Sequence, residues 1–265
     1  MPIYALTGLI ALALKAHYSL AGARDLGWIL APTALLVGWL RGEPLRFDAS
    51  HGWVPDSHRF VIAPACAGVN FLILAFCAAV AGFTGRFATN RGRLAWLAAV
   101  LVGAYLVTIG VNAIRIVTAV ALYDADLHYG WLTAERIHRL AGTVIYLTAL
   151  SATWLVLDRL SGGAAAAGGR RRRSLSPVVP LLAYVGMTVG VPWLNGAWGQ
   201  FGARYVEHGA TVAVLALVAG RLLSSMCSAT SSPSRRGTAA FPSAARGEAD
   251  GQDDDPGGRG RARDR

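Results

Sequence analysis

The feature that most constrains this chain is a series of apolar stretches about as long as a membrane is thick. A helix needs about twenty mainly apolar residues to cross the hydrocarbon core of a bilayer. Only 15% of the residues are charged and 54% are hydrophobic, whereas soluble domains carry about 25% charged residues. The predicted fold class is an all-α, polytopic transmembrane helical bundle with about seven spans, or eight if one is unrecognised. The predicted spans are 3–22, 25–41, 66–84, 94–122, 137–157, 177–195 and 204–223.

The composition changes after residue 223. From there on the chain consists mainly of Ser, Gly, Pro, Arg and Asp, with almost no apolar residues. Such a segment cannot bury enough apolar surface to fold. We therefore expect a transmembrane domain over residues 1–223 and a disordered cytoplasmic tail over residues 224–265. The Gly/Ala-rich and then basic stretch 161–176 is expected to be a flexible connection.

The net charge of +10 does not predict a nucleic-acid partner. The arginines lie at the ends of the predicted spans and in one cluster, Arg170–Arg173, and no basic stripe is interleaved with aromatic residues. Basic residues mark the cytoplasmic side of a membrane protein. With the cluster in the cytoplasm, the loop that precedes Cys66 faces outward.

Cys66 is the most informative of the three cysteines, Cys66, Cys77 and Cys227. Their spacing fits neither a disulfide framework nor a zinc site. Cys66 follows Pro64, a residue typical of helix starts, so we expect it in the first turn of the third span. The positive end of a helix favours a thiolate. Asn70 is expected on the same helical face, and Cys77, about three turns deeper, is interpreted as a packing residue.

Two further polar positions are predicted to lie at the depth of Cys66. The fourth span carries Asn112 and Arg115 near its outer end, and the fifth begins outside with His138. Apolar residues flank Arg115 on both sides, and a charge inside the hydrophobic zone is usually functional. Each residue also has a structural interpretation: Cys66 as core packing, Arg115 as an arginine that reaches the headgroups, His138 as a loop or capping residue, and Asn70 and Asn112 as hydrogen bonds between helices.

Three short motifs resemble a known family in order and spacing. They are Pro64-Ala65-Cys66-Ala67-Gly68-Val69-Asn70-Phe71, Asn112-Ala113-Ile114-Arg115, and His138 with Gly142. Together they resemble the signature motifs of the exosortase/archaeosortase family, and the stretch around Cys66 is most similar to the exosortase K type. The resemblance covers roughly residues 1–223. It departs from the family at Ala67, where many members have Ser, and in the span count, which is often drawn as eight.

The resemblance implies a membrane cysteine endopeptidase/transpeptidase. Such an enzyme cleaves C-terminal sorting signals of membrane-anchored, exported proteins at the outer, periplasmic face of the bacterial cytoplasmic (inner) membrane. Cys66, Arg115 and His138 would form its catalytic set: a thiolate that forms a thioester, a cation that stabilises the thiolate or the oxyanion, and a proton carrier. Asn70 and Asn112 would orient these groups or bind the substrate backbone.

Other classes of function remain open from the sequence. A transporter-like protein would line a polar path with Lys15, Asn112 and Arg115, and an envelope-assembly scaffold would need no catalysis. Glu135-x-x-His138 is half of a di-iron motif, but the sequence contains no second copy. We therefore expect no metal and no organic cofactor. Loss of processing in a Cys66→Ala variant would separate the enzyme from both alternatives.

Overall fold

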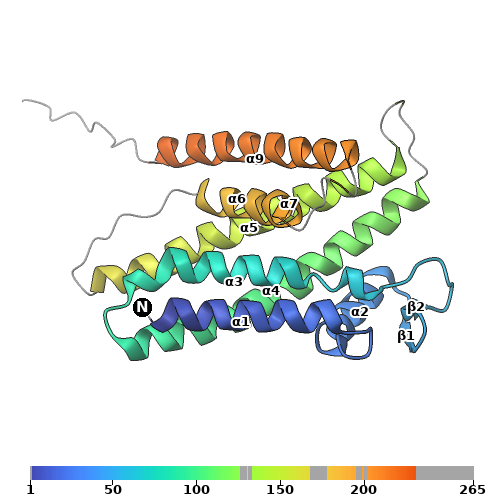
Figure 1. Cartoon of the computed structure of the whole chain (residues 1–265), viewed down its shortest axis with the longest axis horizontal. Coiled ribbons are helices and arrows are strands. Elements are labelled where there is room, and N and C mark those ends of the chain that lie inside the picture. Colours follow the sequence, from blue (N-terminus) through green and yellow to red (C-terminus); the bar gives the residue numbers. More distant parts are fainter. Residues whose placement is uncertain are drawn as a thin grey trace, which may run out of the picture. The chain divides into compact units, whose positions relative to one another are not determined.

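The structure is a computed structural model that describes residues 2–125, 130, 133–167, 178–194, 199 and 202–230. These residues are mostly helical, and each predicted span corresponds to a helix or to a helix with an interruption (Figure 1). The α-helices are α1 (Pro2–Leu20), α2 (Gly27–Arg41), α3 (Val69–Phe83), α4 (Asn90–Asp124), α5 (Ala134–Ala167), α6 (Val178–Val185), α7 (Val191–Leu194) and α9 (Ala203–Thr230).

Four helical stretches among the described residues are long and apolar enough to cross a membrane. They are Pro2–Leu20, Pro64–Arg86, Asn90–Asp124 and Ala134–Ser161. Their apolar character supports the predicted helical membrane protein, while the count of seven spans stays a prediction.

Helix α3 lies at the centre of the bundle. Most of its residues are buried, and it contacts α1, α4, α5 and α6. A helix that is apolar all round belongs in such a central position, and Phe76, Val80 and Phe83 are almost completely enclosed. The other long helices present one side outward, as Leu94, Val102, Leu106 and Ile114 of α4 do.

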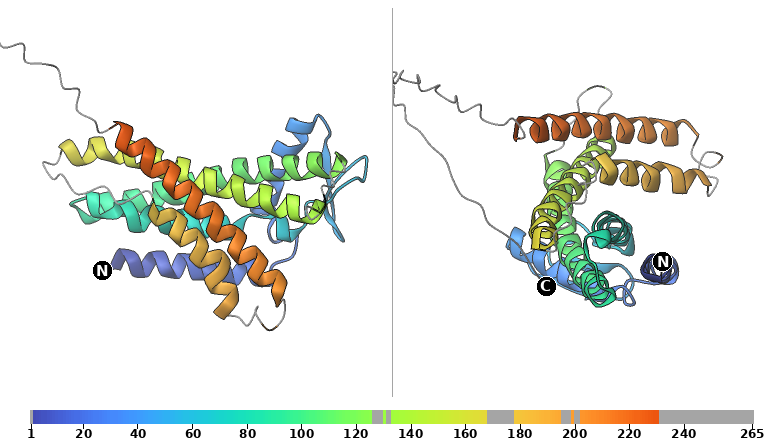
Figure 2. Two further views of the ribbon diagram at one scale, coloured as in Figure 1. Left: turned by 90° about the horizontal axis from the view of Figure 1, so that it is seen from above. Right: turned by 90° about the vertical axis from the view of Figure 1, so that its left-hand side faces the viewer.

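Helices α6 and α9 pack against each other and run steeply across the remaining helices (Figure 2). Between α6 and α7 the chain forms a π-helical segment, η3 (Gly186–Gly190). This confirms the interruption that Gly190-Val191-Pro192 predicts, because proline cannot donate the backbone hydrogen bond of a regular helix. The Tyr205 hydroxyl of α9 donates to the Val189 carbonyl inside η3.

A short β-hairpin lies in the stretch predicted only as a polar loop. Strands β1 (Leu45–Asp48) and β2 (Gly52–Pro55) pair antiparallel, and Asp48 accepts hydrogen bonds from the amides of Ser50 and His51 in the turn between them. Trp53 then exchanges two backbone hydrogen bonds with Ile62, at 3.2 and 2.9 Å. This bridge leads the chain back to the turn that contains Cys66.

Two predicted boundaries are wrong. Helix α5 continues to Ala167, because Ala164 to Ala167 are strong helix formers and extend it into the expected flexible connection. Helix α9 continues past residue 223 to Thr230, because the sequence has no glycine or proline between Gly220 and Pro233. The predicted tail beyond residue 230 and the Arg170–Arg173 cluster lie outside the described residues.

Candidate active site

Cys66 ends a 3-10 turn, η1 (Pro64–Cys66), and does not begin a helix. Helix α3 starts only at Val69, after Gly68 in the left-handed conformation at φ 71°. The predicted helix start at Cys66 is therefore wrong. A Cβ at Gly68 would also lie 3.1 Å from Cγ of Asn112 and 3.2 Å from Cγ2 of Thr108. The position thus requires glycine both for its backbone conformation and for its close approach to α4.

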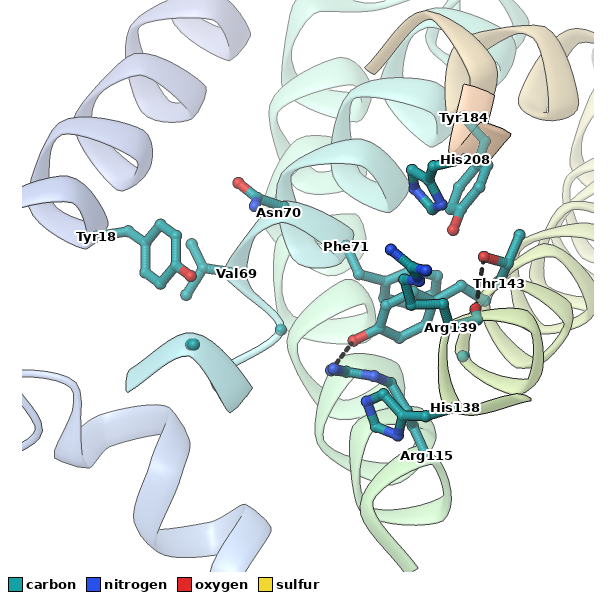
Figure 3. Close-up of a pocket in the computed structure, with 14 residues that line it drawn as sticks. Tyr18, Val69, Asn70, Phe71, Arg115, His138, Arg139, Thr143, Tyr184 and His208 are labelled. Carbon is teal, nitrogen blue, oxygen red and sulfur yellow. Dashed lines mark hydrogen bonds between the residues drawn. The ribbon is translucent and has the colours of Figure 1, made fainter. Parts of the chain in front are cut away.

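The break at Gly68 also separates Cys66 from Asn70. Because the two residues do not share a helix, the prediction that they lie on one helical face is wrong. The Asn70 side chain accepts a hydrogen bond of 3.1 Å from Nζ of Lys15 in α1, and in Figure 3 it points toward α1 and away from Arg115. Asn70 therefore links two helices at the edge of the site.

Asn112 connects the Cys66 turn to Arg115. Its side chain is completely buried, and its amide nitrogen donates to the backbone carbonyl of Cys66. Its Oδ1 accepts two hydrogen bonds, from Nη1 of Arg115 at 3.2 Å and from the hydroxyl of Tyr146 at 3.1 Å. A buried amide with both of its ends bonded is well satisfied, so Asn112 holds the cysteine turn and the arginine in a fixed relation.

Tyr146 completes the support of Arg115. Nη1 of Arg115 donates to the Tyr146 hydroxyl at 3.0 Å, and the guanidinium lies over the Tyr146 ring, 5.4 Å from its centre. The Tyr146 ring also stacks on Phe71, with ring centres 4.8 Å apart. A Cβ on Gly142 would lie 3.4 Å from Nε of Arg115. Gly142 therefore packs directly against the Arg115 side chain, at a distance that an added methyl group would still tolerate.

A cavity of about 270 Å³ lies beside this group. Arg115 and His138 both line it, and the picture places the two side chains next to each other at one end (Figure 3). Ala65 and Gly68, which lie on either side of Cys66 in the chain, also line the cavity, whereas Cys66, which is partly exposed, does not. The structure thus brings the predicted arginine, the predicted histidine and the backbone around the predicted cysteine to one cavity.

Sequence reasoning missed several residues of this cavity. Tyr146 lies within an apolar run, and its partners come from another helix, so no local pattern marks it. The other missed residues are polar and lie within a few turns of a helix terminus. A polar residue at such a position is the only sign in the sequence that could have marked them as cavity residues. They are Arg139, Thr143, Tyr184 and His208.

Within the described part of the chain, no group of three or more His, Cys, Asp or Glu side chains is arranged to hold a metal ion. No family model matches this chain, and no curated protein or solved structure matches it.

Proposed function

We propose that this protein is a membrane-embedded cysteine endopeptidase/transpeptidase of the exosortase type. The observation that carries this proposal is the hydrogen-bonded path from the Cys66 carbonyl through Asn112 to Arg115, beside a cavity that His138 also lines. The motif with Asn112 and Arg115 thus contacts the motif with Cys66 through a hydrogen bond. All three motifs contribute residues to the wall of the cavity, although they come from three different helical segments.

The proposed chemistry divides among the three residues. His138 takes the proton from the Cys66 thiol, and the thiolate attacks the carbonyl carbon of a substrate peptide bond. The C–N bond then breaks, the leaving amine takes the proton from His138, and the acyl group remains on sulfur as a thioester. Water or an acceptor amine then attacks the thioester and gives a proton to His138, the C–S bond breaks, and the Cys66 thiolate is released and takes that proton back. For this chemistry the Cys66 sulfur must reach the cavity wall that Ala65 and Gly68 form.

Arg115 suits the task of stabilising negative charge. Its described partners, Asn112 and Tyr146, are both neutral and both bind Nη1. A guanidinium has five N–H donors, so the donors on Nε and Nη2 remain available for a thiolate or an oxyanion. Removing one donor of this kind commonly raises a reaction barrier by about 3 kcal/mol.

The ion pairs support the predicted division of the loops into two sides, and we propose that the side with the cavity faces the periplasm of a bacterial cytoplasmic membrane. Arg41 pairs with Asp124 at 3.5 Å and Arg136 with Glu207 at 2.7 Å, and all four residues belong to the predicted outer side. The pair of Arg86 with Asp158 joins two residues of the predicted cytoplasmic side. The physiological substrates would be exported, membrane-anchored proteins with C-terminal sorting signals, and about seven spans would hold the enzyme in the bilayer.

A transporter-like function has less support. A second and larger cavity among the described residues, about 470 Å³ between α3, α4 and α5, has an almost entirely apolar lining that includes Ala79, Val100, Gly103 and Val156. The polar cavity at Arg115 therefore does not continue into this deeper one as a polar path.

Substitution of the cysteines tests the proposed enzyme. Cys66→Ala and Cys66→Ser should abolish processing of the C-termini of exported proteins in the native cell, measured by mass spectrometry, with the protein still folded and inserted. Cys77→Ala is the matched control and should leave processing intact, because Cys77 packs within α3. Normal processing in cells that carry Cys66→Ala would rule out the peptidase.

A further inference from the structure

The apolar cavity between α3, α4 and α5 is open on the outer surface of the helical bundle. Its lining includes exposed residues of two helices, Ala99 of α4 and Ala152, Val156 and Leu160 of α5. A Cβ on Gly103, which also lines it, would meet nothing within 4 Å, so the space beside it can accept further atoms. We call this open cavity of about 470 Å³ the α4–α5 groove.

The length of the α4–α5 groove corresponds to one leaflet of a bilayer. Along α4 its lining begins at Trp96 and ends at Val107, and this stretch of helix rises about 16 Å. The hydrocarbon core of a bilayer is about 30 Å thick, so one leaflet contributes about 15 Å. An acyl chain therefore fits the groove along its length, whereas a transmembrane helix would need a groove about twice as long.

The Trp96 end of the groove lies toward the predicted cytoplasmic side. Helix α4 begins at Asn90, shortly after Arg86, and Arg86 pairs with Asp158 of α5. Leu160 of α5, which follows this pair closely in the chain, lines the groove. The groove thus extends from the cytoplasmic end of α4 and α5 toward the middle of the membrane, which is the path of an acyl chain in the cytoplasmic leaflet.

A cationic side chain lies at this cytoplasmic end. Arg159 is exposed and comes seven residues after Ala152, which is nearly two helical turns, so both lie on almost the same face of α5. The neighbouring Asp158 is paired with Arg86, and within the described part of the chain Arg159 forms no ion pair. An apolar groove with a cation at its end matches a phospholipid that has an anionic headgroup.

We propose that the α4–α5 groove binds an acyl chain of an anionic phospholipid from the cytoplasmic leaflet, with the phosphate of this lipid beside Arg159. The inference goes beyond the proposed peptidase and does not depend on it. Val107 lines the inner end of the groove, and the next residue, Thr108, lies close to Gly68 at the end of the Cys66 turn. A bound chain would fill the space below this turn and stabilise the folded protein by mass action.

A photoactivatable phosphatidylglycerol with a diazirine in one acyl chain tests the groove directly. The full-length protein in detergent is mixed with this probe and irradiated, and mass spectrometry identifies the labelled peptides. Labelling should concentrate on residues 96–107 and 152–160 and should fall when unlabelled phosphatidylglycerol is added. Equal labelling of all exposed apolar helix faces would overturn the proposal.

Filling the groove should remove the label. Gly103→Leu places a large side chain in the groove and should lower labelling of residues 152–160 about tenfold, because it displaces buried methylene groups of the lipid. Gly110→Leu is the matched control: it lies on the same helix, also has open space around its Cβ and does not line the groove. It should be labelled like the wild type. Equal labelling of the two variants would contradict binding in the groove.

The headgroup preference tests Arg159. Phosphatidylcholine with the same photoactivatable chain is the matched zwitterionic probe, and the phosphatidylglycerol probe should label the groove about fivefold more, as expected for one basic residue near an anionic headgroup. Arg159→Gln changes an exposed residue, keeps the fold and should remove this preference. Arg221→Gln, at an exposed position of α9, should retain it. An unchanged preference in Arg159→Gln would overturn the assignment of the headgroup.

A helix of a second copy of this chain is the other candidate occupant. In a chain with Cys66→Ala, Cys77→Ala and Cys227→Ala, the thiol of Gly103→Cys would then form a disulfide-linked dimer under mild oxidation. Such a dimer in place of lipid labelling would overturn the proposal. Cys66→Ala alone should be labelled like the wild type. Cys66-dependent processing without lipid labelling would discard the groove alone, and lipid labelling with processing that does not need Cys66 would discard the enzyme alone.

Discussion

The side-chain amide of Asn112 donates a hydrogen bond to the backbone carbonyl of Cys66, and the same amide group accepts one from Arg115. One buried residue thus fixes both the turn that carries the thiol and the cation proposed to stabilise its charge. Asn112→Ala should lower stability by about 2–3 kcal/mol, because it leaves buried partners unbonded. It should also reduce processing in the protein that remains folded.

Thr33→Val provides the comparison for Asn112→Ala, since the Thr33 hydroxyl is buried but bonds only within its own helix, to the Ile29 carbonyl. Thermal unfolding in detergent and processing in cells should both change much less in this variant. Equal losses of processing in the two variants would mean that Asn112 has no special role in the site.

Gly68→Ala tests whether the cysteine turn needs its left-handed residue. The new methyl group would meet Asn112 and Thr108, and the backbone conformation at φ 71° disfavours any side chain. We expect a loss of about 1–3 kcal/mol together with loss of processing. Gly110→Ala in α4 meets nothing within 4 Å and should be neutral or stabilising by up to about 1 kcal/mol. Similar unfolding temperatures for both variants would contradict the packing described for Gly68.

The sequence predicts the helices and the proximity of Arg115 and His138 because both follow from the length and the order of the apolar stretches. Apolar length marks the helices, and the direction of successive spans places the ends of α4 and α5 together. The turn at Cys66 was not predictable in this way. Pro64 is typical of a helix start and therefore suggested that the helix begins at Cys66. The break at Gly68 is not visible in the sequence, because Gly68 packs closely against Asn112 of another helix.

The supporting residues were missed for a related reason. Tyr146 has no distinguishing neighbours, and its role arises only from Asn112, Arg115 and Phe71, which lie on α3 and α4. Asn70 was predicted to act with Cys66 from its spacing alone, but the helix break redirects it to Lys15. Periodicity describes a residue within its own helix and does not identify its partners on other helices.

The ion pair at the other end of α3 should affect stability without affecting chemistry. Arg86 pairs with Asp158 and donates to the Ser161 hydroxyl at 2.6 Å, and its side chain is only 8% exposed. Arg86→Gln should cost about 2 kcal/mol, because it removes the ion pair to Asp158 from a side chain that is almost buried. Processing per folded molecule should stay at the wild-type level. A loss of processing without a loss of stability would contradict a purely structural role for Arg86.

The hairpin region should open at low pH. The Ser57 amide donates to Glu43 at 2.8 Å, and hydrogen bonds from Ser57 lower the pKa of Glu43 below its ordinary 4.5. Because the folded pKa is the lower one, this stabilisation is complete above pH 4.5 and is lost as the pH falls through the folded value. The same sign holds for Asp48, whose pKa is lowered by the amides of Ser50 and His51.

Hydrogen exchange of residues 43–57 between about pH 6 and about pH 3 measures this opening. The protection factor, which corrects each exchange rate for the intrinsic pH dependence of amide exchange, should fall toward the lower pH in the wild type. Glu43→Gln should exchange faster than the wild type at the higher pH and approach it at the lower pH. A constant difference between the two proteins across this range would contradict a role for the ionised Glu43.

The most direct test of the account is the rate at which Cys66 of the folded protein reacts with iodoacetamide at neutral pH, compared with the rates in Arg115→Gln and His138→Gln. If sulfur, guanidinium and imidazole share one cavity, each substitution should slow alkylation of Cys66 about tenfold and leave that of Cys77 unchanged. Equal Cys66 rates in all three folded proteins would contradict the proposed active site.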